Sequence, residues 1–155
     1  MFGLQGSLYV LSLGDERSTP LLLRLNLSSG EWTEIGELPT VLDTPSLTSY
    51  DGCLVICGLD AAEAGSGEQK LITYNPVDGT WGSYDSANIP LYTTIVDANE
   101  SLYLVGGTRN PDDENQTLDT VFSFDPENGA VTEVASLSAP GCGLQAVASG
   151  STIAV

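Results

Sequence analysis

The residue types that most often carry enzyme chemistry are scarce in this sequence of 155 residues. It contains no histidine, the usual general base and the commonest metal ligand of proteins. Ser-His-Asp and Cys-His mechanisms are therefore excluded within this chain. The patterns GxxxxGK[ST], GxGxxG and HExxH, typical of phosphate, dinucleotide and zinc sites, are also missing. We expect no catalytic residue and no cofactor here, unless the rest of a longer chain supplies catalytic groups.

Carboxylates are the one plentiful reactive group, and they are densest at Asp112, Asp113 and Glu114. Glycosidases need two carboxyl groups held about 5–9.5 Å apart, which a loop run of this kind is poorly suited to do. With Asn115 the run offers oxygen ligands for Ca²⁺, but the Asp-x-Asp-x-Asp-Gly spacing is absent. We therefore predict no metal site.

The charge balance points to the kind of partner. The chain has 21 acidic and four basic residues, for a net charge of −17. Such a charge steers basic partners toward a protein and argues against nucleic acid, whose phosphates need Lys and Arg. No apolar run approaches the roughly 18 residues of a membrane span. We predict a protein partner with a basic peptide or surface, no nucleic acid and no membrane span.

The N-terminal residues and the cysteines say little about the compartment. Residues 1–5 have no basic stretch, so no signal peptide is predicted and a cytoplasmic location is slightly favoured over secretion. Cys53 and Cys57 lie four apart on a predicted strand, about 13 Å at ~3.3 Å per residue, which is too far for a disulfide. With Cys142 they are interpreted as three small buried thiols. Asn115 starts an Asn-Gln-Thr sequon and is the candidate glycosylation site if the protein is secreted.

The elements that would position these residues come from an internal repeat. Three landmark glycines lie 49 and 50 residues apart, and three prolines lie 51 and 50 residues apart: Gly30, Gly79 and Gly129, then Pro39, Pro90 and Pro140. The stretches around the glycines read LNLSSGEW at 25–32, YNPVDGTW at 74–81 and FDPENGAV at 124–131. The third copy also carries LYLVGG at 102–107. Each copy predicts strand, long loop, strand, glycine turn and strand.

These motifs resemble the kelch repeat, whose period is near 50 residues and whose copies form the blades of a β-propeller. The resemblance implies an all-β fold with about three four-stranded blades, in copies 6–51, 52–100 and 101–150, with 151–155 starting a fourth. The start of the chain matches the second strand of a blade. Propellers have about 4–8 blades. We therefore expect a partial propeller, or half of a ring that self-association with another chain completes.

The predicted strands follow the alternation of apolar residues and the turn signals, and no helix is predicted. They cover 7–12, 21–27, 31–36, 45–50, 53–57, 70–75, 80–84, 92–98, 101–105, 120–125, 130–135, 144–148 and 151–155. The Asn-Gly pair at 128–129 predicts a two-residue turn with two positive φ angles. The strand aromatics are predicted to lie in the core: Tyr9, Trp32, Tyr74, Trp81, Tyr103, Phe122 and Phe124.

The long loops collect at one end of such blades, because the four strands alternate in direction. That end holds the loops between second and third strands and the loops between blades, and scaffolds usually place binding residues on long loops. The predicted partner-binding residues there are Asp15, Glu16, Arg17, Asp60, Glu63, Glu68, Tyr92, Arg109, Asp112, Asp113 and Glu114. The glycines at 30, 79 and 129 are predicted to be structural turn residues at the opposite end.

The resemblance also suggests a function. Kelch propellers commonly act as protein-interaction modules, scaffolds and substrate adaptors, including receptors of ubiquitin ligases. Such receptors often have Arg soon after the blade-opening proline. Here Pro39 is followed by Thr40 and Pro90 by Leu91, which favours a basic partner over an acidic one. The alternatives are an extracellular carbohydrate-binding or glycan-processing propeller, and a structural block within a larger assembly.

Overall fold

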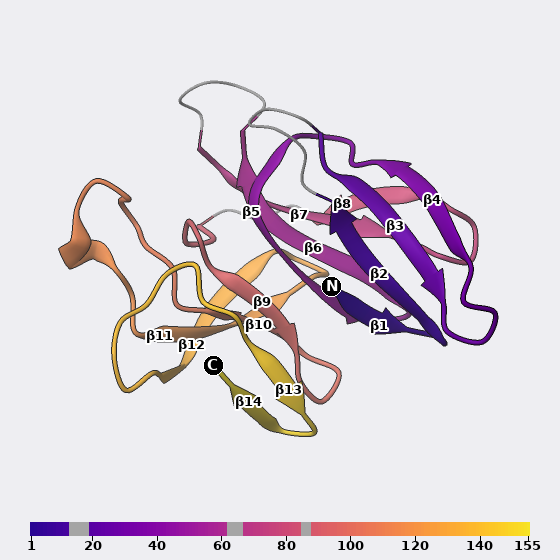
Figure 1. Cartoon of the computed structure of the whole chain (residues 1–155). Helices are drawn as coiled ribbons and strands as arrows, with labels where there is room; N and C mark the ends of the chain where they lie inside the picture. Colours follow the sequence, from indigo (N-terminus) through magenta and orange to yellow (C-terminus); the bar gives the residue numbers. More distant parts are fainter. Residues whose placement is uncertain (13–18, 62–66, 85–87) are drawn as a thin grey trace.

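The computed structural model describes residues 1–12, 19–61, 67–84 and 88–155, whose strands form three four-stranded antiparallel sheets and a hairpin (Figure 1). The first sheet contains β1 (Phe2–Leu4), β2 (Ser7–Ser12), β3 (Leu21–Asn26) and β4 (Trp32–Glu37). The second contains β5 (Leu42–Tyr50), β6 (Cys53–Asp60), β7 (Gln69–Tyr74) and β8 (Trp81–Tyr84). The third contains β9 (Thr94–Asp97), β10 (Leu102–Val105), β11 (Thr120–Asp125) and β12 (Ala130–Ser136). The hairpin is β13 (Val147–Ser149) with β14 (Thr152–Ala154).

The order of strands in each sheet follows the chain, which confirms the predicted all-β architecture. In the described part of the chain, the 3₁₀ turn η1 (Glu114–Gln116) is the sole helical segment, and no helix there is long and apolar enough to cross a membrane. The prediction that the chain starts at the second strand of a blade is wrong. Phe2 pairs with Tyr9 and Leu4 with Ser7, so β1 is the first strand of the first sheet.

The turns between the first and second strands are tight. Asp51 and Gly52 have φ angles of 47° and 75°, and Asn99 and Glu100 have 54° and 60°. Two successive positive φ angles are typical of the type I′ turn, whose twist matches that of the flanking strands. The first-to-second strand connections are therefore two-residue hairpins.

The turns between the third and fourth strands differ from the prediction. They are four-residue loops when counted between the paired residues Asn26 and Glu31, Asn75 and Thr80, and Asp125 and Ala130. Only the last residue of each loop has a positive φ angle, 73° at Gly30, 75° at Gly79 and 71° at Gly129. The predicted two-residue turn at 128–129 is wrong, because Asp125 holds a longer loop by accepting the N–H of Glu127 at 2.9 Å. Equivalent bonds join Asn26 to the N–H of Ser28 and Asn75 to the N–H of Val77, each at 2.9 Å. This Asx geometry leaves one left-handed position, which glycine fills without strain.

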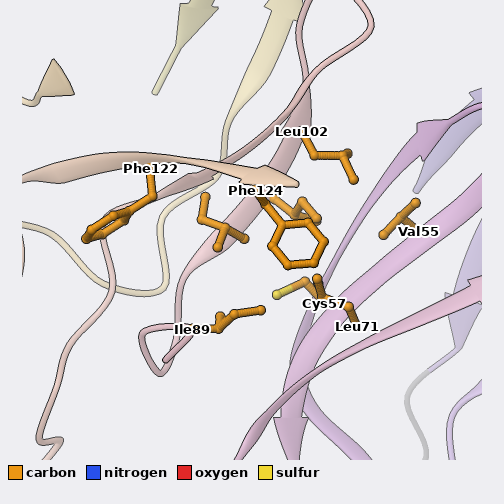
Figure 2. Close-up of a cluster of buried hydrophobic side chains, with 9 residues drawn as sticks. Val55, Cys57, Leu71, Ile89, Leu102, Phe122 and Phe124 are labelled. Carbon is orange, nitrogen blue, oxygen red and sulfur yellow. The ribbon is translucent and has the colours of Figure 1, made fainter. Parts of the chain in front are cut away.

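The hydrophobic core lies between neighbouring sheets. We call the face of a sheet that looks toward the preceding sheet its leading face, and the opposite one its trailing face. Figure 2 shows Leu102, Phe122 and Phe124 on the leading face of the third sheet, packed with residues of the second sheet that include Val55 and Cys57. The sheets therefore stabilise one another by burying apolar surface.

Strand β6 is buried on both faces. Its residues Leu54, Val55, Ile56 and Cys57 are all 0% exposed, alternating between the core with the first sheet and the core with the third. A strand covered on both sides reads as a continuous apolar run rather than an alternating one. The second sheet is thus the centre of the described structure.

The aromatic and cysteine predictions are partly wrong. Tyr9, Tyr74, Phe122 and Phe124 are buried as predicted, and Trp81 and Tyr103 are half-buried. Trp32 is 57% exposed, because it lies on β4 and faces away from the second sheet. All three cysteines are free, but only Cys57 is buried, whereas Cys53 is half-buried and Cys142 is exposed. Burial raises the pKa of Cys57 to about 12, against the opposing effect of the hydrogen bond from Gln69.

The glycine pair of the third copy is required by close packing. A Cβ on Gly106 would lie 2.3 Å from the carbonyl oxygen of Gly141, and one on Gly107 would lie 2.8 Å from that of Leu91. The N–H of Gly107 donates to the carbonyl of Gly141 at 2.8 Å. The pair thus admits the backbone of two neighbouring loops at the end of β10.

Candidate functional site: an inner groove and the loops around it

A groove runs along the first strands of the sheets. In Figure 1, β1, β5 and β9 lie toward the middle with β13, and residues 1–2, 44–48, 92–97 and 143–148 line one cavity of about 630 Å³. We call this cavity the inner groove. Its lining brings together four segments that are far apart in the sequence.

Hydroxyl groups join the walls of the inner groove. The hydroxyl of Ser46 accepts the N–H of Ile95 at 3.1 Å, and the hydroxyl of Thr48 accepts the N–H of Asp97 at 2.9 Å. Both acceptors are on β5 and both donors are on β9. The side-chain hydroxyls therefore accept the backbone N–H groups at the edge of β9 that no neighbouring strand binds. Each hydroxyl keeps its own proton, and half-buried Ser46 can therefore still donate a hydrogen bond to a ligand, whereas Thr48 is buried.

Asp97 is the one charged side chain among the lining residues, which include no Lys or Arg. Its Oδ1 atom is buried without a hydrogen-bond partner. Burial raises the pKa of Asp97, while the N–H groups of Ser101 and Glu100 act in the opposite direction. The groove is thus neutral to acidic and suits neutral polar or cationic groups.

The rim of the groove has a repeated backbone feature. Thr44, Tyr92 and Gly143 have φ angles of 46°, 54° and 60°, and each is the first residue of one groove-lining segment, 44–48, 92–97 or 143–148. The N–H of Tyr92 donates to Oε1 of Gln69 at 3.2 Å, and its carbonyl accepts the N–H of Gly143 at 2.8 Å. A left-handed non-glycine residue is unfavourable and persists only where its surroundings determine it. At Tyr92 the hydrogen bonds with Gln69 and Gly143 fix this backbone conformation.

The loops at the same end form one hydrogen-bonded platform. Leu91 and Thr108 exchange backbone hydrogen bonds of 2.9 and 2.8 Å. The N–H of Gly141 donates to the carbonyl of Leu118 at 3.0 Å, and the N–H of Leu118 donates to that of Gly107 at 2.8 Å. Loops from both sides of the third sheet are therefore fixed relative to one another.

The loop end of the second sheet has a charged anchor. Asp60 forms an ion pair with Lys70 and accepts the hydroxyl of Thr40 at 3.1 Å. The N–H of Ala61 donates to the carbonyl of Val41 at 3.0 Å. Asp60 thus fastens the loop that enters β5.

The structure places the predicted partner-binding residues in different settings. Asp15, Glu16, Arg17 and Glu63 lie outside the described residues. Glu68, Arg109 and Asp112 are exposed on the loop end, whereas Tyr92 is half-buried on the rim of the groove. These exposed residues and Tyr92 share the end of the molecule that the sequence predicted.

The acidic run at 112–114 forms a turn that leads into η1. Asp113 accepts the backbone N–H of Asn115 at 3.0 Å and its side-chain amide at 2.9 Å, so it caps η1, which contains Glu114. These bonds lower the pKa of Asp113. Among the described residues, no group of three or more His, Cys, Asp or Glu is placed to hold a metal ion. The candidate sequon residue Asn115 is exposed.

The sequence analysis missed the groove itself. The missed residues are Ser46 and Thr48 on β5, Gln69 on β7, whose side chain bonds Cys57 and Tyr92, and Asp97. The available signal was the pair of hydroxyl residues two apart on a predicted first strand, because residues two apart share one face of a strand.

The comparisons with known proteins agree with this geometry. Residues 94–138 match the family model described as the Kelch motif, a segment that contains β9 to β12. The structure is similar to that of YjhT, a kelch-type propeller, with a TM-score of 0.73 and 17% sequence identity. The match covers 96% of this chain and 55% of that chain, so this chain spans little more than half of that propeller. No curated protein sequence matches. The fold is therefore that of a kelch-type propeller, with three four-stranded blades and the β13–β14 hairpin in the described part of the chain.

Proposed function

We propose that this kelch-type propeller segment is a non-catalytic module that binds another protein through its loop end. The observation that carries the proposal is the hydrogen-bonded platform formed by the loops at 91–92, 107–118 and 141–143. A fixed loop surface loses little conformational entropy on binding, which favours affinity. The rim of the inner groove lies at the same end and gives the platform a recess.

The proposed partner presents a basic peptide or surface. The chain carries a net charge of −17, and Glu68 and Asp112 are exposed on the loop end. Lys70 is engaged by Asp60, and the groove lining has no Lys or Arg. Charge complementarity of this kind speeds encounter and selects against acidic partners.

Tyr92 is the proposed anchor of the interface. It lines the groove and is half-buried, its N–H donates to the side chain of Gln69, and its carbonyl accepts the N–H of Gly143. Tyr is among the residues that dominate binding energy at protein interfaces. A preorganised ring on the rim can contact a peptide that enters the groove.

The test is a binding titration followed by fluorescence anisotropy. Labelled peptides rich in Lys and Arg are compared with peptides in which Asp and Glu replace those residues. We expect only the basic set to bind, and more weakly as salt rises from about 0.1 M to about 1 M, because the Debye length shrinks from about 10 Å to about 3 Å. Tyr92→Ala should weaken binding at least about tenfold, or about 1.4 kcal/mol.

The matched control is Val77→Ala, since Val77 is 81% exposed on a turn at the opposite end. It should bind like the natural chain. Equal binding of acidic and basic peptides, no binding of any basic peptide, or an unaltered affinity of Tyr92→Ala would each contradict the proposal.

A second candidate function is binding of a neutral carbohydrate in the inner groove. The volume of about 630 Å³ and the hydroxyl-bearing lining residues Thr44, Ser46, Thr48 and Thr94 favour it. Small-molecule sites commonly have volumes of about 300–1,000 Å³ with a few placed polar groups. Neutral oligosaccharides added during NMR measurement should shift the amide signals of Ile95 and Asp97, and Thr48→Val should abolish the shift. Signals that stay in place with every oligosaccharide would rule this function out.

A further inference from the structure

The turns after the third strands of the second and third blades contain a pair of side chains that bond each other across the loop. In the second blade, Nδ2 of Asn75 donates to Oδ2 of Asp78 at 3.2 Å. In the third blade the two residue types are exchanged, and Nδ2 of Asn128 donates to Oδ2 of Asp125 at 2.7 Å. Each of these turns therefore combines one amide with one carboxylate, so that one side chain donates and the other accepts.

The later residue of each pair also closes its turn. Oδ1 of Asp78 and Oδ1 of Asn128 accept the N–H two residues later at 3.0 and 2.9 Å, and Oγ of Ser29 does the same in the first blade at 3.3 Å. A carboxylate, an amide and a hydroxyl thus occupy equivalent places in three turns. The third turn differs chemically, because Asn128 and Gly129 form the one Asn-Gly pair of the sequence.

An Asn-Gly pair can lose its side-chain amide without an enzyme. The backbone nitrogen of the glycine bonds to Cγ of the asparagine, and the side-chain nitrogen leaves as ammonia with the proton that the backbone nitrogen gives up. The product is a cyclic imide. One water molecule then opens the ring at either carbonyl, which yields aspartate or its isomer with the backbone running through Cγ. Glycine favours ring closure, because it has no Cβ to crowd the attack and its backbone is unrestricted.

We propose that Asn128 is the residue at which the folded chain deamidates, and that the product destabilises the hairpin of β11 and β12. Asn128 is exposed, and local hydrogen bonds hold its turn. The N–H of Gly129 donates to the carbonyl of Asp125 at 2.8 Å, so this bond must open before the ring can close. Exposed turns held by local bonds open without unfolding of the sheet. This turn lies at the end opposite the proposed binding loops, so neither proposal depends on the other.

The other asparagines of the chain are followed by residues that disfavour the reaction. Asn75 and Asn110 precede proline, which has no backbone N–H to give up. The remaining ones precede leucine, isoleucine, glutamate or glutamine, whose side chains crowd the attacking nitrogen: Asn26, Asn88, Asn99 and Asn115. Asn128 should therefore react first.

Deamidation would place two carboxylates where the second blade has one. Oδ2 of Asp125 accepts its hydrogen bond from Nδ2 of Asn128, and a carboxylate in place of that amide has no proton to donate. Two negative charges this close repel each other. The isomer also lengthens the backbone of the loop, and the length of a hairpin loop helps to set the register of its strands. Both products should thus weaken the hairpin.

The experiment is incubation of the folded chain at mildly alkaline pH, followed by peptide mapping with mass spectrometry. We expect the peptide that contains Asn128 to exchange its amide for an acid before any other peptide, and faster at higher pH, because the attacking nitrogen must lose its proton. Asn128→Ser should remove this product and keep the turn, since Ser29 holds the equivalent place in the first blade. A first product at another asparagine, or an intact Asn128 under conditions in which the urea-unfolded chain reacts there, would overturn the proposal.

A set of variants tests the effect on the hairpin without waiting for the reaction. Asn128→Asp should lower the urea midpoint at neutral pH, and adding Asp125→Asn should restore it, because the pair then copies Asn75 and Asp78. The matched control adds Glu127→Gln to Asn128→Asp instead. It has the same net charge as the restored variant but keeps both carboxylates, so it should remain destabilised. An unaltered midpoint of Asn128→Asp, or equal recovery in the two double variants, would contradict the stated effect of deamidation.

Discussion

At the scale of single residues, two aspartates have pKa values shifted in opposite directions. Burial raises the pKa of Asp97 in the inner groove. Asp78 lies in the exposed turn after β7, where the hydroxyl and the N–H of Thr80 donate to it at 2.7 and 3.0 Å and lower its pKa. The same side-chain type therefore responds to pH in two ways within one molecule.

Asp97→Asn should remove the loss of stability that ionisation of Asp97 causes as pH rises. The folded pKa of Asp97 lies above the unfolded value of about 3.9, so the folded state binds more protons there. The contribution of Asp97 to the free energy of unfolding is fully present below the unfolded pKa and is lost as pH rises through the folded pKa. Urea denaturation from about pH 4 to 7 should show the natural chain losing stability relative to the variant as pH rises. A constant difference would contradict the cause assigned to the shift.

Asp78→Asn provides the comparison with the opposite sign. Because the folded pKa of Asp78 is lowered, its contribution is present above the unfolded pKa and is lost as pH falls through the folded one. The natural chain should therefore gain stability relative to this variant as pH rises from about 2 to about 5, the range to which the urea series is extended for Asp78. Equal slopes for both variants would show that general charge repulsion, rather than the two local settings, governs the pH response.

Alanine substitutions at Gly106 and Gly143 would distinguish the cost of backbone strain from the cost of steric overlap. Both have positive φ angles, 63° and 60°, but a Cβ would meet the Gly141 carbonyl at 2.3 Å in the first case and nothing within 4 Å in the second. Gly143→Ala should cost about 1 kcal/mol of unfolding free energy, the price of a left-handed alanine. Gly106→Ala should cost at least roughly twice as much, since a loop must also move. Chemical denaturation of both variants checks the order, and equal costs would contradict it.

At the scale of elements, the glycine turns after the third strands share one construction. Each has a side-chain oxygen that accepts an N–H two residues later and ends in a left-handed glycine. The repeat of about 50 residues therefore preserves a hydrogen-bond pattern although the loop residues differ. Because the turn type and loop length of a hairpin set its register, this turn contributes to the register of the last two strands of each sheet.

Gly79→Asn should be tolerated better than Gly79→Ala. The position has a φ angle of 75° and free space around the Cα atom, so only conformational preference decides the cost. Asn adopts the left-handed region more readily than alanine does. We expect the alanine variant to lose about 1 kcal/mol of unfolding free energy and the asparagine variant clearly less. Thermal and urea denaturation of the two variants should rank them in that order; the reverse ranking would mean that the loop adopts another turn.

The strands were predictable from the sequence, and the groove was not. Apolar alternation and turn residues predicted β2, β3 and β11 to within one residue, because these signals are local. The exposure of Trp32 depends on which face of β4 a neighbour covers, which no local pattern contains. The contacts of Ser46 with Ile95 join segments 49 residues apart and exist only once the sheets have packed. The predicted loop end was a topological inference, and Tyr92 does lie on the groove rim there.

At the scale of the whole molecule, the second blade is covered on both faces and the outer elements on one. The four residues Leu54 to Cys57 on β6 are 0% exposed, whereas the terminal hairpin has Val147 at 69% exposure. Buried strands exchange their amide hydrogens only in large unfolding events, while thinly covered elements open locally. The blades should therefore open in order from the ends toward the middle.

Hydrogen exchange followed by mass spectrometry tests this order. Peptides from β6 should exchange slowest, and those from β13 and β14 should exchange orders of magnitude faster. The control is a denatured sample, which removes differences in intrinsic exchange. Uniform protection across β6 and β14 would show that the described blades and the hairpin unfold as one cooperative unit.

The left-handed residue at the start of a groove-lining segment determines which side chain faces the opening, whereas the sheets provide the scaffold. The backbone hydrogen bond between Gly143 and Tyr92 and the bond from Tyr92 to the side chain of Gln69 hold the bend at these two residues. Thr44, Tyr92 and Gly143 place a hydroxyl, a phenol and no side chain around one opening. Interchanging these three residue types would alter the shape and polarity of the opening while the sheets keep their pairing. The second blade, the third blade and the hairpin thus each offer one position at which a substitution should alter what the opening admits.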